Sequence, residues 1–257
     1  MKILLSNDDG YFAEGIVTLA LALAEEHDVR VSAPAAERSG AGHALTFNRA
    51  FKWTEIAPDE MLLTGADGKR IPFHAVHGSP ADAVKFALEY IYRDEKFDLV
   101  ISGINSVPNI GSDIIYSGTF GAAEEGSVLG VPSVAVSAAA YDGGYALAAE
   151  FVKNNLSALH AAASPYVTVN VNVPSGDRGK IKGVAVVPLG IRRYNDWYEH
   201  DGSGGYELFG SPGNYAADKE ETDCKMFDLG YITVTPVRVL CTDEGSVARV
   251  RENGWKI

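Results

Sequence analysis

A strand, a polar loop, a helix and a second strand follow one another within the first 33 residues, and this order constrains the fold more than any other feature of the chain. Residues 2–5 form an apolar run typical of a buried strand, and residues 28–33 form a second one. Between them, residues 13–25 carry apolar side chains at helical spacing. This order implies a right-handed crossover between two parallel strands. The sequence therefore predicts the opening of a Rossmann-like sheet.

The alternation of strands and helices continues along the chain. Three further strands are predicted at residues 97–102, 132–137 and 166–174. Two further helices are predicted at residues 119–129 and 144–160. Another helix start is well marked, because Ser79 suits the N-cap, Pro80 the first helical position and Asp82 the first turn. We expect an α/β fold of three layers, in which helices cover both faces of a mostly parallel sheet.

Two segments interrupt this pattern. Residues 47–77 contain strand-like pieces in glycine-rich sequence, which indicates a small hairpin insertion. Residues 190–223 are polar, glycine-rich and aromatic, and a structureless loop of that length is uncommon in a compact domain. We expect an extended hairpin or arm that packs against another subunit, although a mobile surface insertion also fits. The predicted division is a Rossmann-like core over residues 1–189 and an oligomerisation arm with a return strand over residues 190–257.

Composition excludes several classes of protein. The chain of 257 residues has 34 acidic and 22 basic residues, and a formal charge of −12 is unsuited to binding polymeric nucleic acid. A GxGxxG fingerprint is absent from the first turn, so NAD or FAD binding is not supported. The two cysteines have neither disulfide-framework nor zinc-site spacing. No apolar run is long enough for a membrane span or a secretory signal, and we expect a cytoplasmic protein with no membrane partner.

Paired carboxylates follow the first strand directly, in the sequence NDDG at residues 7–10. Ligands of open α/β sheets bind outside the carboxyl ends of the strands, where Asp8 and Asp9 are expected to lie. Adjacent like charges repel unless water or a cation screens them, and a divalent ion bound through oxygens is a common solution. A solvated turn is the alternative, because Asn, Asp and Gly are turn formers.

Two more loops are expected at the same edge of the sheet. The loop after the strand at 97–102 carries Asn105, Asn109 and Asp113, and it ends in Ser117, Gly118 and Thr119 at the start of a helix. A helix start can bind an anion, although serine and threonine at this position more often serve only as the N-cap. The loop at residues 33–46 carries Ser39, Gly40 and His43. Ser39 is also typical of a turn, and His43 of a hydrogen-bonded structural group.

Six motifs in one order resemble the SurE family of survival-protein nucleotidases. They are NDDG (7–10), RSGAGHALT (38–46), GSPADAVKFAL (78–88), GIN (103–105), GSDIIYSGTFGAAEEG (111–126), and TD with GYITVTP (222–236). An ordered set that spans nearly the whole chain is far more specific than any single motif. The sequence departs from the family pattern at Val107, where glycine is usual, and this puts substrate preference in doubt.

The resemblance implies a metal-dependent phosphomonoesterase that hydrolyses nucleoside 5′- and 3′-monophosphates. It implies that one divalent ion, Mg²⁺ or Mn²⁺, is held by Asp8, Asp9, Ser39 and Asn105. It also implies that phosphate contacts Ser117, Gly118 and Thr119, and that the protein is a homodimer or homotetramer. The catalytic residues remain unidentified, with Asp113 and His43 as candidates for the general acid.

Two other functions remain open. A nucleotide-sensing module would bind metal and phosphate without turnover. A sugar-nucleotide glycosyltransferase also uses strand-end aspartates and a metal, but it would release no phosphate from monophosphates.

Overall fold

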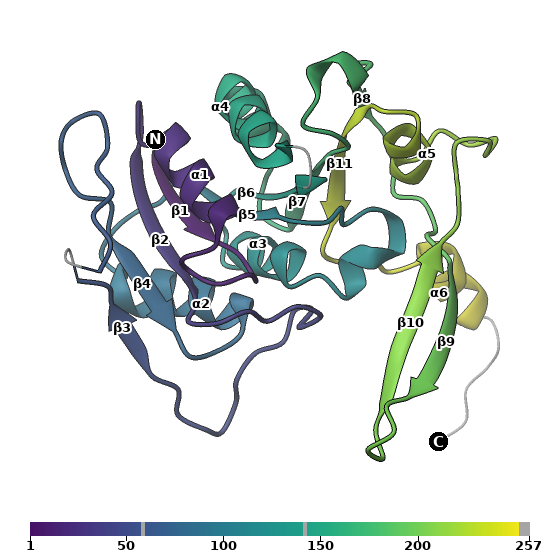
Figure 1. The fold of residues 1–257 in the computed structure, drawn as a ribbon, viewed down its shortest axis with the longest axis horizontal. Coiled ribbons are helices and arrows are strands. Elements are labelled where there is room, and N and C mark those ends of the chain that lie inside the picture. The colour runs from purple at the N-terminus through teal and green to yellow at the C-terminus, as the bar shows by residue number, and fades with distance from the viewer. Residues whose placement is uncertain (58–59, 141–142, 252–257) are drawn as a thin grey trace.

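A nine-stranded sheet forms the centre of the protein (Figure 1). The computed structural model describes residues 1–57, 60–140 and 143–251. The strands of this sheet are β1 (Lys2–Ser6), β2 (Asp28–Pro34), β3 (Trp53–Glu55), β4 (Phe73–Val76), β5 (Leu99–Asn105), β6 (Ser133–Ala138), β7 (Val167–Val173), β8 (Val184–Val186) and β11 (Ile232–Arg238). Their order across the sheet is β3-β4-β2-β1-β5-β6-β7-β11-β8. All neighbours are parallel except β3 with β4 and β7 with β11.

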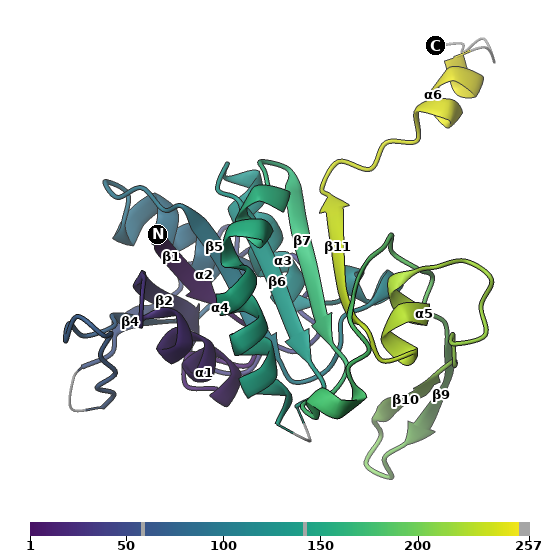
Figure 2. The ribbon, with the colours of Figure 1, turned by 90° about the horizontal axis from the view of Figure 1, so that it is seen from above.

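Helices cover both faces of the sheet (Figures 1 and 2). The helices on one face are α1 (Glu14–Leu23) and α4 (Gly144–Ala162), and those on the other are α2 (Pro80–Phe86), with its π-helical continuation η1 (Ala87–Ile91), and α3 (Gly118–Val128). Strand β1 shows why two cores form, because Ile3 and Leu5 join the larger apolar cluster beside α1 and α4, and Leu4 joins the cluster beside α2 and α3. Successive side chains of a strand point to opposite faces, so a fully apolar strand serves both layers. The predicted three-layer α/β fold is thereby confirmed.

Helix α2 begins as the sequence predicts. The Ser79 side chain accepts a hydrogen bond from the Asp82 backbone N–H at 2.9 Å, and the Asp82 carboxylate accepts one from the Ser79 backbone N–H at 2.8 Å. This capping box, with Pro80 in the first turn, satisfies donors that a helix start leaves free. The helix start fixes the position of Asp82, which also binds the loop at residue 46.

An antiparallel hairpin projects from the body (Figures 1 and 2). It consists of β9 (Tyr194–His200) and β10 (Tyr206–Pro212), which pair with each other and with no strand of the large sheet among the described residues. Trp197 stacks on Phe209 with ring centroids 5.9 Å apart, which stiffens the ribbon. The extended hairpin is thus confirmed, whereas its use in oligomerisation stays a prediction.

Some elements differ from those predicted. The short helices α5 (Asp223–Asp228) and α6 (Glu244–Arg251) and the 3₁₀ turns η2 (Gly111–Ile115) and η4 (Arg178–Lys180) were not expected. The strand-like pieces at residues 47–77 form β3 and β4, which extend the edge of the main sheet. The predicted division of the chain into a core that ends at residue 189 and a C-terminal arm stays a prediction. Residues 58–59 of the predicted insertion and residues 252–257 of the predicted arm lie outside the described part of the chain.

In the described part of the chain, every helix is too short or too polar to cross a lipid bilayer.

Candidate functional site

The strand order reverses at β1, and this reversal marks the candidate site. The chain passes from β1 to β2 on one side and later returns to place β5 on the other side. The loops after β1 and β5 therefore diverge to opposite faces of the sheet and leave room at its carboxyl edge, where open α/β sheets bind their ligands. Residues 7–10 and Asn105 lie at this edge.

A tight turn presents the two aspartates. The Asn7 side chain donates to the Gly10 carbonyl at 2.8 Å and accepts from the Gly10 N–H at 3.2 Å, which closes the turn. Asp8 is 5% exposed and Asp9 is half-buried. Burial raises the pKa of Asp8, and burial together with the charges of Asp8 and Glu37 raises the pKa of Asp9 to about 6. The pair is therefore costly to ionise where it stands.

The start of helix α3 is packed against Asp8. The Thr119 hydroxyl donates to Asp8 Oδ1, and the Thr119 N–H also bonds this carboxylate. Gly118 allows the approach, because a Cβ at this position would lie 2.8 Å from the Asp8 Cβ. The first turn of α3 thus fixes the direction of the Asp8 carboxylate.

The segment after β2 brings a third carboxylate and a hydroxyl to the same edge. The Arg38 backbone N–H donates to the Asp8 carbonyl at 2.7 Å, which ties this segment to the NDDG turn. Ser39 is exposed, and its hydroxyl donates to Glu37 Oε1 at 2.6 Å. The serine oxygen therefore keeps its lone pairs for a cation. Glu37 was missed in the sequence, although it stands two residues before Ser39 and its charge acts on both aspartates.

Asn105 ends the strand next to β1. Its Nδ2 donates to the Val107 carbonyl at 2.8 Å, so the amide oxygen is the end that is left for a ligand. A register shift against β6 between Ser102 and Asn105 sets its position. Val107, where the sequence departs from the family pattern, is 58% exposed, and its side chain leaves the hydrogen bond to Asn105 intact.

The side chains at this edge fit a hard divalent cation. Carboxylates, a hydroxyl and an amide are oxygen donors of the kind that Mg²⁺ and Mn²⁺ prefer. All three causes that raise the pKa of Asp9 disfavour its charged form. Within residues 1–57, 60–140 and 143–251, neither Asp8 nor Asp9 forms an ion pair with a basic side chain. No set of three or more His, Cys, Asp or Glu side chains in those ranges is arranged to hold a metal. A cation here would thus depend on the neutral oxygens of Ser39 and Asn105 as well.

The predicted phosphate-binding residues are buried and have structural partners. Ser117 is the N-cap of α3, and its Oγ accepts from the Phe120 N–H at 2.9 Å, which leaves the hydroxyl proton free to be donated. Thr119 is fully buried and directs its hydroxyl to Asp8. The structure therefore shows Thr119 orienting a carboxylate, and its contact with phosphate stays a prediction.

Both candidates for the general acid are engaged elsewhere. The Asp113 carboxylate accepts hydrogen bonds from Arg192 Nη1 at 2.5 Å and from the Tyr194 hydroxyl at 2.6 Å. His43 bonds Glu124 and Glu125 with its two ring nitrogens. Asn109 is a structural residue, because its amide nitrogen donates to Ser137 and its carbonyl accepts from two asparagines of β7. None of these partners is visible in the local sequence.

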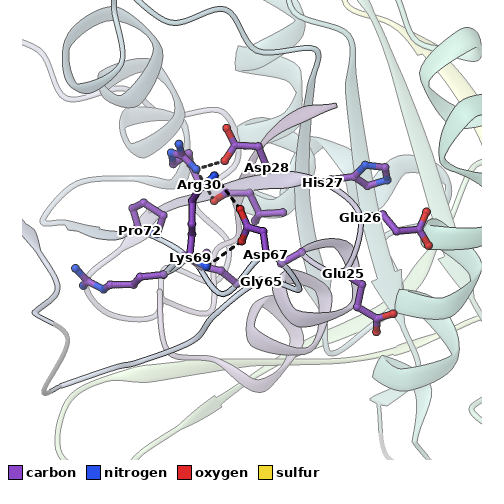
Figure 3. Close-up of a pocket in the computed structure, with 13 residues that line it drawn as sticks. Glu25, Glu26, His27, Asp28, Arg30, Gly65, Asp67, Lys69 and Pro72 are labelled. Atoms are coloured by element: carbon purple, nitrogen blue, oxygen red, sulfur yellow. Dashed lines mark hydrogen bonds and ion pairs between the residues drawn. The ribbon is translucent and has the colours of Figure 1, made fainter.

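A separate hollow lies at the opposite edge of the sheet (Figure 3). This cavity of about 420 Å³ is bounded by the end of α1, the amino end of β2 and residues 65–72. Its cations face carboxylates, Arg30 with Asp28, Lys69 with Asp67 at 3.0 Å, and Arg70 with Glu55 at 3.7 Å. Glu55 lies on β3 outside the wall, and Glu25 and Glu26 of the wall pair with Lys153 of α4. The charged side chains of this hollow thus have partners of opposite charge, unlike Asp8 and Asp9 at the carboxyl edge.

Comparisons with known proteins agree on one family. The model of the family described as "Survival protein SurE" matches residues 3–196. The 5′-nucleotidase SurE of Petrotoga mobilis is 39% identical over 247 residues, which is 94% of each chain, and that of Kosmotoga olearia is 38% identical over 263 residues, which is 98% of each. The crystal structure of the SurE protein from Aquifex aeolicus superposes with a TM-score of 0.80 at 33% identity, covering 98% of this chain and 99% of that one. The family suggested by the ordered motifs is confirmed, and the chain belongs to the SurE family.

Proposed function

We propose that this protein is a nucleotidase that hydrolyses nucleoside 5′- and 3′-monophosphates to nucleoside and phosphate, and that it depends on one divalent metal ion. The observation that carries the proposal is the buried Asp8 carboxylate beside Asp9 at the start of α3. Relatives that align over nearly the whole chain are named 5′-nucleotidases, which supports the reaction class.

The metal would be held by Asp8, Asp9, Ser39 and Asn105, with Mg²⁺ or Mn²⁺ as the expected ion. When bound, such an ion would neutralise charge on a phosphoryl oxygen and make a coordinated water more acidic. Its charge would also offset the burial and the repulsion by Asp8 and Glu37 that together raise the pKa of Asp9 to about 6.

The chain's own residues would bind and orient the phosphate. The start of α3 directs a positive dipole end at the carboxyl edge, and anions are stabilised there. Ser117 has a hydroxyl proton to donate, because its oxygen already accepts the N-cap bond. Thr119 would hold Asp8 in place for the reaction by its hydrogen bond. Fixed donors of this kind are typically worth roughly 3 to 4 kcal/mol each in a transition state.

The test compares Asp8→Asn with Asp94→Asn, a control at an aspartate whose side chain is 92% exposed. Phosphate release is measured on 5′- and 3′-monophosphates with EDTA-stripped protein, before and after Mg²⁺ or Mn²⁺ is restored. We expect metal-dependent release that falls by roughly 100-fold or more in Asp8→Asn, because a charged ligand is lost, and that is unchanged in Asp94→Asn.

Three outcomes would reject the proposal. Near-normal release by Asp8→Asn would remove the carboxylate pair from the mechanism. Metal and nucleotide binding by the unmodified protein without any phosphate release would instead favour the sensing module, and transfer of sugar from a sugar nucleotide would favour the glycosyltransferase.

A further inference from the structure

The segment at residues 38–46 connects the candidate site to helices α2 and α3. At its start, the Arg38 N–H bonds the Asp8 carbonyl, and Ser39 follows. At its end, Thr46 donates both its N–H and its hydroxyl to the Asp82 carboxylate, at 2.8 and 2.6 Å. Between these ends the chain crosses α3. We call residues 39–46 the serine loop.

Little in the serine loop fixes its own shape. Gly40 and Gly42 have φ angles of 75° and 55°, a region in which glycine has no steric penalty but gains no rigidity either. His43 is the only ionisable side chain between Ser39 and Thr46. The conformation of this stretch must therefore come from its contacts with neighbouring elements.

His43 makes the charged contact of the serine loop with α3. Its Nδ1 lies 2.8 Å from Glu124 Oε2 and its Nε2 lies 2.7 Å from Glu125 Oε2. Adjacent residues of a helix do not share a face, so a ring that reaches both carboxylates lies across the helix surface. Close packing supports the same contact, because a Cβ on Gly121 of α3 would lie 2.5 Å from the Gly42 carbonyl oxygen.

This geometry requires the doubly protonated ring. A neutral imidazole has one N–H and one lone pair, and the lone pair would face a carboxylate here. The hydrogen bonds with Glu124 and Glu125 raise the pKa of His43 to about 9 despite partial burial. Lys85 of α2 is the other described cation at this point, with its Nζ 2.7 Å from Glu125 Oε1. The four side chains form a neutral group of two cations and two anions.

We infer that His43 is a positioning residue. Its contacts with Glu124 and Glu125 fasten the serine loop to α3, an attachment that we call the clasp, and so hold Ser39 at the carboxyl edge of the sheet. This inference rests on the proposed role of Ser39 in holding a cation. It assigns to His43 a role that is neither general acid nor ligand. Residues that orient a metal-binding group typically contribute about 10- to 100-fold to metal affinity.

The first experiment follows the serine loop without any substrate. Amide hydrogen exchange is compared in the unmodified protein, in His43→Gln, and in His160→Gln, a matched control on α4 at the opposite face of the sheet. The Gly42 amide, which donates to the Tyr116 carbonyl at 3.1 Å, is the reporter, and the Thr46 amide, held by Asp82 on α2, is the internal reference. We expect His43→Gln to speed exchange at Gly42 by roughly tenfold or more, with Thr46 unchanged.

The second readout is Mn²⁺ binding by calorimetry, with the metal alone. We expect the Kd of His43→Gln to rise by about 10-fold and that of His160→Gln to stay unchanged. Neither readout uses phosphate release, so a protein that fails as a nucleotidase would still test the clasp. Unchanged Gly42 exchange together with unchanged Mn²⁺ affinity in His43→Gln would overturn the inference.

A third readout separates the clasp from a simple packing role. The ring protons of His43 are titrated by NMR in the unmodified protein and in Glu124→Gln. Because its pKa is raised above the ordinary 6.5, the clasp is complete below about pH 6.5 and is lost as the pH rises through about 9. We expect a midpoint near 9 that falls in Glu124→Gln, and a midpoint at the ordinary value in the unmodified protein would contradict the clasp.

Discussion

Among single residues, Asp9 shows most directly what the candidate site costs the protein. Its half-buried carboxylate stands beside Asp8 and within the field of Glu37, and these surroundings raise its pKa to about 6. The ionised form is disfavoured in the folded protein and is not disfavoured in the unfolded chain. Without a cation, the site therefore lowers the stability of the fold.

Asp9→Asn is predicted to stabilise the metal-free protein at neutral pH. The folded-state pKa is raised from the ordinary 3.8, so the folded state holds the proton longer, and the unmodified protein loses stability as the pH rises from about 4 through about 6. After allowance for solvent screening at a half-exposed group, we expect the variant to gain about 1 kcal/mol above that window.

The gain is measured by urea unfolding in EDTA at pH 4 and pH 7.5, with Asp94→Asn as the control. A gain of the same size at both pH values would show that the effect does not come from ionisation of Asp9. Added Mn²⁺ is expected to reverse the order, because it stabilises only the protein that keeps both carboxylates.

The sequence predicts site residues that directly follow a strand, and it misses contacts between residues far apart along the chain. Asp8, Asp9 and Asn105 follow predicted strands, and parallel strands bring their carboxyl ends to one edge. Ser39 lies in a predicted strand-end loop, but its role as a metal ligand came from the family resemblance. The partners of His43 and Asp113 lie about 80 residues away along the chain, and such contacts depend on the packed fold.

At the scale of elements, α3 organises the candidate site along its length. Its first turn meets Asp8 through Thr119 and the serine loop at Gly121, and its second turn carries Glu124 and Glu125. The helix presents small residues where it is closest to other backbone. Its own buried face is thus shaped to receive the loops of the site.

Gly121→Ala is predicted to destabilise the protein, although alanine is the better helix former by about 1 kcal/mol. The new Cβ would lie 2.5 Å from the Gly42 carbonyl oxygen and 2.9 Å from the His43 Cα, and both are backbone atoms that cannot rotate away. We expect a net loss of about 1 to 3 kcal/mol in the free energy of unfolding, together with faster amide exchange in the serine loop.

Gly179→Ala is the matched control, because its Cβ would approach only the exposed Asp177 carboxylate, at 3.2 Å. Its expected effect is within about 0.5 kcal/mol. If Gly121→Ala were as stable as the unmodified protein, the close contact between α3 and the serine loop would be refuted.

The elements themselves were predicted best where periodicity is strong. Helices α1, α3 and α4 and strands β1, β2, β6 and β7 lie close to their expected ranges. Helices α5 and α6 were missed because each is shorter than the window in which a helical period can be recognised. Strand β8 is short, since its pairing with β11 covers only three residues.

For the whole molecule, the β9–β10 hairpin is the clearest sign of assembly. Tyr198, Tyr206 and Leu208 on this hairpin are 68%, 72% and 56% exposed. Large apolar groups gathered on a projecting ribbon are typical of a surface that another chain covers. We propose that the hairpin packs against a second copy in a dimer or tetramer.

Replacing residues 196–210 with a short Gly-Ser turn is predicted to lower the mass of the assembly without unfolding the subunit. Arg192 and Tyr194, which bond Asp113 at the base of the hairpin, stay in place. Sedimentation velocity measures the mass and circular dichroism the fold, with removal of residues 202–204 at the hairpin tip as the control. An unmodified protein that sediments as a monomer, or an unchanged assembly after the replacement, would refute the role of the hairpin.

The position of β11 late in the chain also delays the completion of the sheet during synthesis. Strand β8 pairs only with β11 among the described strands, and β11 leaves the ribosome later in the chain. The delay is about fifty residues, or roughly 3 to 10 seconds at ordinary rates of translation. During that interval β7 has an open edge, while the strands that carry Asp8 and Asn105 have already been made. A nascent chain stalled before residue 232 would therefore expose a pairing edge to neighbouring nascent chains, and growing polypeptides on one messenger would be prone to join there.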